Sequence, residues 1–187
     1  MHLKRKSTAL ATLTAAAALA GCGSSSSSSG VSASAYVKSV CGAVIPFEQD
    51  VLTRSASINP TSIKSAAAGK QVLHQFLSAI SDDTSTAVSK LQSAGSPSVS
   101  NGKQISSAIL DAFKRLKTTM VSATSQASSL PTSSLQAFES GTQTIIGSVR
   151  TSMSAIGTDL QSSTLKSPDL QKAAAKESTC KGLGGSA

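Results

Sequence analysis

The sequence predicts an all-α protein: an up-down four-helix bundle with a short fifth helix at its C-terminal end. Apolar residues recur at steps of three or four through four long segments of the 187-residue chain, which is the spacing of amphipathic helices. The chain has no Trp, one Tyr and four Phe, so its core is built from small and aliphatic side chains. The connections between segments are short, and therefore neighbouring helices are expected to be antiparallel.

The first two segments differ in how they begin and end. The first carries its apolar positions between Val37 and Val51, and Pro46 inside it predicts a kink or a break. The second is predicted to open at Asn59-Pro60, because Asn caps helices and Pro suits their first turn. Gly95 is the expected C-cap. The second helix has a heptad-like core stripe. Its members are Ala66, Lys70, Leu73, Leu77, Ile80, Thr84, Ala87, Leu91 and Ala94.

The third segment opens at Asn101, with Gln104 as the expected capping-box partner. The fourth opens near Ser133, and a fifth helix is expected from Ser167-Pro168-Asp169 to about Ser178. The third stripe comprises Ile105, Ile109, Ala112, Leu116, Met120, Ala123, Ala127 and Leu130. The fourth comprises Leu135, Phe138, Thr142, Ile146, Val149, Met153, Ile156 and Leu160.

The N-terminus has the pattern of an export signal. Lys4, Arg5 and Lys6 precede an uncharged stretch, Ala9–Ala20, that is rich in Ala and Leu. This stretch is shorter than the about 20 residues that a membrane-spanning helix needs. A basic start, a short apolar stretch and small residues after it are typical of a signal peptide.

The signal ends in Leu19-Ala20-Gly21-Cys22, which resembles the lipobox of bacterial lipoproteins at all four positions. The resemblance implies that Leu19, Ala20 and Gly21 direct the signal peptidase, that residues 1–21 are removed, and that Cys22 carries diacylglycerol and can be acylated on its new amine. Two or three acyl chains give a stable anchor. The expected location is the extracytoplasmic face of the cell membrane. The alternative is an ordinary secreted protein in which Cys22 is incidental.

The predicted organisation after the signal has three parts. Residues 22–34 form a disordered, flexible linker of Gly and Ser behind the lipidated Cys22. Residues 35–181 form the helical bundle, and residues 182–187 form a disordered tail. The linker serines are interpreted as a tether, and glycosylation of the serine tract is the alternative.

Two cysteines remain once Cys22 is lipidated. An up-down bundle with an even number of helices brings its two chain ends to the same end, and a short fifth helix can carry Cys180 back to Cys41. Export places both thiols in an oxidising compartment, where disulfides persist. We therefore predict a Cys41–Cys180 disulfide. The alternative is one buried and one exposed free thiol.

No catalytic residue, metal site or cofactor is predicted. His74 is the only histidine after the signal and is interpreted as a residue at the edge of the core. Asp82-Asp83 is interpreted as a solvated turn or helix face, because adjacent helical residues diverge by about 100°. The densest basic cluster of the domain, Lys114, Arg115 and Lys117, has two interpretations: a solvated helix face, or attraction to anionic lipid or wall polymer.

The segments Tyr36-Val37-x-x-Val40-Cys41 and Pro46-Phe47-Glu48 resemble small Ala/Ser/Thr-rich helical lipoproteins of actinobacterial type. That resemblance implies no particular activity. We expect a non-enzymatic interaction or structural module of the cell envelope, whose partners are the membrane and an envelope protein or wall polymer rather than nucleic acid. The alternative is a carrier of a lipid or small apolar ligand bound between the helices. The sequence does not determine the oligomeric state.

Overall fold

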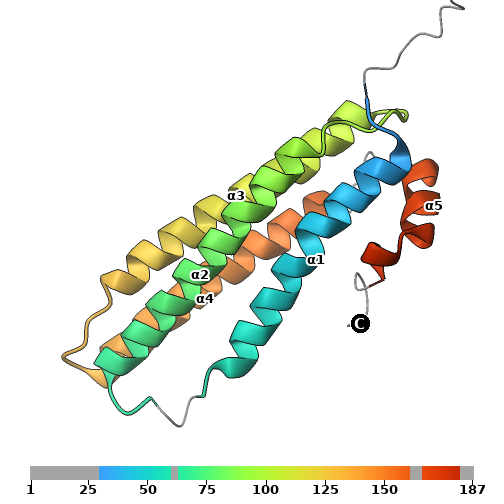
Figure 1. Ribbon diagram of the computed structural model, residues 1–187. Coiled ribbons are helices and arrows are strands. Elements are labelled where there is room, and N and C mark those ends of the chain that lie inside the picture. The colour runs from blue at the N-terminus through green and yellow to red at the C-terminus, as the bar shows by residue number, and fades with distance from the viewer. Residues whose placement is uncertain (1–29, 60–62, 161–165, 182–187) are drawn as a thin grey trace, which may run out of the picture.

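The computed structural model describes residues 30–59, 63–160 and 166–181, and these ranges are all-helical apart from turns and one isolated bridge. Four long helices run up and down beside one another (Figure 1), which confirms the predicted architecture. They are α1 (Ala33–Ser57), α2 (Ala66–Ser93), α3 (Gly102–Ser128) and α4 (Leu135–Leu160). The short helix α5 (Pro168–Lys176) and the 3-10 helix η3 (Ser178–Cys180) pack along α1.

The antiparallel pair α2 and α3 forms the centre of the bundle. Their predicted stripes are confirmed, except that Lys70, Leu73 and Ile109 are half-buried rather than buried. Thr84 is completely buried, and its hydroxyl donates a hydrogen bond of 2.6 Å to the Ile80 carbonyl. A polar residue therefore occupies a core position without an unpaired donor.

The core face predicted for α4 is partly wrong. Phe138 is buried as expected, but Ile146 and Met153 are 48% and 50% exposed, and Ile145 is buried instead. Leu135 is also exposed. The helix α4 packs chiefly on α3 and only lightly on α2. Because one main neighbour determines which residues are covered, Ile145 is buried in place of the adjacent Ile146, whereas Val149 and Ile156 pack against the core as predicted.

The start of α2 lies later than predicted. The helix begins at Ala66 rather than at Asn59-Pro60, and Pro60 lies outside the described residues. Ser65 is its N-cap, with a side-chain oxygen that accepts a hydrogen bond of 3.2 Å from the Ala68 N–H. A capping hydroxyl satisfies one of the free N–H groups of the first turn. The opposite end agrees with prediction, because Gly95 adopts a left-handed φ of 71°.

The other two helices begin where predicted, near Asn101 and Ser133, but their caps differ from the prediction. Asn101 precedes α3 in a left-handed conformation with φ of 59° and makes no capping hydrogen bond with its side chain. The predicted capping box with Gln104 is therefore wrong, because that motif needs the Asn101 side chain to face the first turn. At α4 the cap is Ser134 rather than Ser133, and its hydroxyl oxygen accepts from the Ala137 N–H at 3.3 Å.

Pro46 does not break α1, which continues from Ala33 to Ser57. Proline cannot donate the usual hydrogen bond to the carbonyl four residues earlier, which here belongs to Gly42. The Lys90 ammonium of α2 donates to that carbonyl oxygen at 3.5 Å. A contact between helices thus occupies the acceptor that Pro46 leaves free.

Candidate functional site

The chain enters the bundle through a backbone contact that the sequence did not indicate. Val31 forms a parallel bridge with Pro97 in the α2–α3 loop. Its N–H donates to the Ser96 carbonyl at 2.8 Å, and its carbonyl accepts from the Ser98 N–H at 2.7 Å. Gly30 lies so close to this loop that a Cβ would come within 2.7 Å of the Ser96 oxygen. The last residues of the predicted linker, from Gly30 onward, therefore pack against the bundle.

The first turn of α1 follows directly from this bridge. Ser32 caps α1 and accepts a hydrogen bond of 3.2 Å from the Ala35 N–H. The helix begins at Ala33, two residues before the predicted start of the bundle. The only sequence signal for this docking is one apolar residue, Val31, at the end of a Gly/Ser segment.

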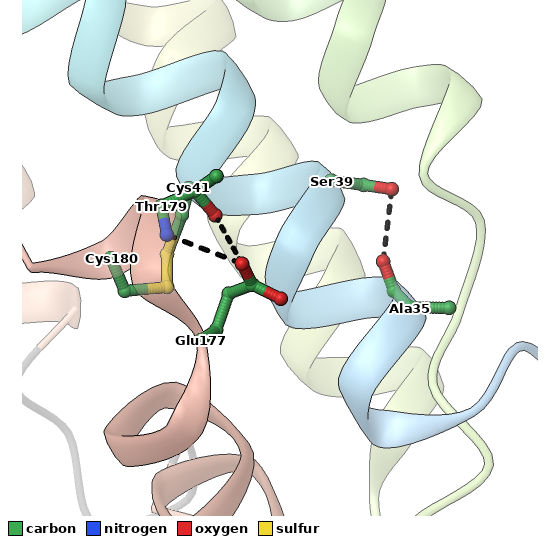
Figure 2. Close-up of a disulfide and its surroundings, with 6 residues drawn as sticks. All are labelled: Ala35, Ser39, Cys41, Glu177, Thr179 and Cys180. Atoms are coloured by element: carbon green, nitrogen blue, oxygen red, sulfur yellow. Dashed lines mark hydrogen bonds between the residues drawn. A yellow bond between two sulfur atoms is a disulfide. The ribbon is translucent and has the colours of Figure 1, made fainter.

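The predicted disulfide lies at the same end of the bundle. Cys41 of α1 and Cys180 of η3 are joined, with Cα atoms 5.2 Å apart, across a sequence separation of 139 (Figure 2). Both cysteines are buried. The bond closes a loop that contains most of α1 and all of α2, α3, α4 and α5.

A small apolar cluster surrounds the disulfide and holds α5 against α1. Buried Val37 lies next to the two cysteines in this cluster. Ile45 of α1 and three residues of α5 pack around them; the α5 residues are Leu170, Ala173 and Ala174. Ser167 caps α5 by accepting from the Leu170 N–H at 3.4 Å. The bond is therefore supported by a separate small core rather than by the main core.

Two ionisable groups at this end have shifted pKa values. The Glu177 carboxylate accepts hydrogen bonds from the backbone N–H and the hydroxyl of Thr179, at 3.2 and 3.0 Å (Figure 2). These bonds favour the charged form and lower the pKa of Glu177 below its ordinary value of 4.5, and nearby Lys38 contributes in the same direction. Burial raises the pKa of Tyr36 to about 12. Both groups keep their usual charge at neutral pH.

The basic cluster of α3 is partly neutralised by carboxylates. Arg115 pairs with Asp159 of α4 at 2.7 Å, and Lys114 pairs with Asp111 at 3.7 Å. All four side chains are about half exposed, where such pairs contribute at most about 1 kcal/mol. The pairs favour the interpretation of a solvated helix face over that of a binding patch.

The other candidate residues lie apart from one another. Asp83 pairs with Arg54 of α1 at 3.3 Å, whereas its neighbour Asp82 is exposed on α2. His74 is half-buried on α2. Within the described ranges, no three His, Cys, Asp or Glu side chains gather in a group suited to a metal ion.

The long helices share one core, and a hollow lies beside it between α3 and α4. Buried residues of α2, α3 and α4 form one continuous core, against which Phe47 and Val51 of α1 pack. Phe47 and Phe113 meet edge to face, with ring centroids 5.9 Å apart. A hollow of about 420 Å³ lies between α3 and α4 and is lined in part by Thr118, Ser152 and Ile156. The ligand-carrier hypothesis stays a prediction.

The lipidation residues Leu19, Ala20, Gly21 and Cys22 lie outside the described residues. Among the helices that the structure describes, none combines the length and the apolar character needed to cross a membrane. Comparison of the chain with protein-family models, with curated proteins and with solved structures finds no match.

Proposed function

We propose that this protein is a lipid-anchored, non-enzymatic module of the cell envelope, a helical rod that serves structural or binding roles at the extracytoplasmic face of the membrane. The observation that carries the proposal is the use of the three cysteines. Cys41 and Cys180 form a disulfide, which suits an oxidising compartment. The remaining thiol, Cys22, stands in the lipobox.

The position of the chain entry supports the anchoring role. The chain enters the bundle at Gly30, at one end of the long helices (Figure 1). The 28 residues of α2, at 1.5 Å each, make a rod about 40 Å long. A domain anchored by one end holds most of its helical surface away from the bilayer. That surface is therefore accessible to an envelope protein or a wall polymer.

Metabolic labelling with an alkyne fatty acid tests the anchor. We expect label on the wild-type chain and on the matched control Cys41→Ser/Cys180→Ser, but none on Cys22→Ser. Cys22→Ser should also leave the membrane fraction. Equal labelling of Cys22→Ser and the wild type would refute the anchor.

Crosslinking in intact cells tests the interaction role. A photoreactive residue at exposed Leu52 or Met153 samples the sides of the rod, and one at exposed Lys172 samples its anchored end. We expect one discrete adduct from the sides of the rod. Crosslinks that do not differ from those of an unrelated anchored protein would contradict a binding role.

A further inference from the structure

The charges of the domain are separated along its long axis. We define the tether end as the N-terminal half of α1, the last turn of α2, the α2–α3 loop, the first turn of α3, and the chain from residue 166 to 181. This end carries seven lysines and two carboxylates, a net charge of +5. The rest of the described domain carries seven basic and seven acidic side chains and is neutral.

The ion pairs of the described residues lie outside the tether end. All three join side chains of the neutral part. At the tether end, Lys90 donates to the Gly42 carbonyl, and the charge of Lys38 acts on Glu177. Besides these two lysines, which form no ion pair either, five more are exposed at the tether end without an ion pair among the described residues. They are Lys103, Lys166, Lys172, Lys176 and Lys181.

Helix α5 presents two of these lysines on its outer side. Its apolar residues, such as Leu170, pack around the disulfide on α1. Lys172 and Lys176 are four residues apart, and therefore lie on one helix face, and both are exposed. Lys103 and Asp169 line one hollow of about 630 Å³ beside the chain entry. Lys103 of α3 and the first turn of α5 therefore border the point at which the chain enters the bundle.

The tether is short enough to bring this end to the bilayer. Seven residues lie between Cys22 and Gly30, so the Cα atoms of these two residues are at most about 28 Å apart when the segment is fully extended. The charges of an anionic leaflet act over about 8 Å at physiological salt. The lysines of the tether end therefore lie within reach of the headgroups, whereas the other end of α2 is about 40 Å farther along the rod.

We propose that the tether end docks on anionic phospholipid headgroups through these lysines and thereby orients the rod outward from the membrane. The proposal rests on lipidation of Cys22, which brings the lysines to the surface. Each lysine at an anionic surface changes the docking equilibrium by about fivefold. A wall polymer is the competing occupant, but the tether places the membrane nearest to the lysines.

The test uses the full-length lipidated protein, reconstituted in vesicles and followed by hydrogen exchange. One set of vesicles contains phosphatidylglycerol and phosphatidylcholine, and the other contains phosphatidylcholine alone. On anionic vesicles we expect amide exchange in α5 and η3 to slow by at least about fivefold, and 1 M salt to abolish the effect because the screening length falls to about 3 Å. Exchange in the middle of α2 should not change.

Two variants with equal charge change separate position from net charge. Lys172→Gln/Lys176→Gln/Lys181→Gln should lose the protection. The matched control, Lys64→Gln/Lys117→Gln/Arg150→Gln, removes three exposed charges from the neutral part and should keep it. Both variants should exchange like the wild type on neutral vesicles, which shows that they fold.

Three outcomes overturn the docking. They are equal α5 exchange on both vesicles, equal loss of protection in both variants, and protection that persists in 1 M salt. Failure of the anchor gives a different result, because the protein would then appear in the supernatant and its N-terminal peptide would carry no lipid mass.

Discussion

Removing the Cys41–Cys180 bond should destabilise the whole bundle and not only α5. The bond closes a loop with a sequence separation of 139, and the chain-entropy relation gives about 5 kcal/mol for a loop of this length at 25 °C. That value is an upper figure, because α5 can undock in the reduced protein, and the conformational freedom that it gains offsets part of the lost stability. Domains have a total stability of about 5–15 kcal/mol, so the bond accounts for a large share.

Urea unfolding of Cys41→Ser/Cys180→Ser measures this contribution. With a slope of about 2 kcal/mol per molar urea, the midpoint should fall by about 2 M. Reduced wild-type protein is the matched control, because it keeps both side chains and loses only the bond, and it should show nearly the same midpoint. If reduction frees α5 for exchange while the midpoint of the long helices stays within about 0.3 M of the oxidised value, the loop-closure reasoning is refuted.

Two further predictions concern glycines and a carboxylate. Gly102→Ala should lower the free energy of unfolding by about 1–3 kcal/mol, because the new Cβ would collide with the Pro97 carbonyl oxygen. Gly147→Ala has open space around it and should raise the free energy of unfolding by about 0.5–1 kcal/mol. Thermal unfolding compares the two variants, and equal shifts of the melting temperature would contradict the packing argument. Glu177→Gln should be less stable than the wild type at pH 7, because the Thr179 hydrogen bonds lower the pKa of Glu177 below 4.5. The carboxylate therefore stabilises above its ordinary pKa, and that stability is lost as pH falls through the lowered pKa. The urea midpoints of the two proteins should therefore converge as the pH falls below 4.5, and a constant difference across pH would count against the assignment.

Sequence reasoning was most successful where one helix face meets several neighbours. The α2 and α3 stripes, including polar Thr84, follow from spacing alone because both helices are covered by neighbouring helices on their apolar sides. It failed at Ile145 and Ile146, which are adjacent and equally apolar. Only the position of α3 determines which of the two is buried. The start of α2 was predicted wrongly because two segments, Asn59-Pro60 and Ser65, each have the residue types of a helix start. The helix uses Ser65 as its cap.

The sequence by itself determined the helical class, the antiparallel order of the long helices and the lipobox hypothesis at Cys22, because each depends on residue type and spacing along the chain. It predicted the Cys41–Cys180 pair from the expected topology, and the structure shows the bond. The tertiary structure decided how distant residues combine. It pairs Arg115 with Asp159, docks Val31 on the α2–α3 loop and places seven exposed lysines at the tether end. These results depend on where the antiparallel helices place residues that are far apart in the chain, and local patterns carry no information about that placement.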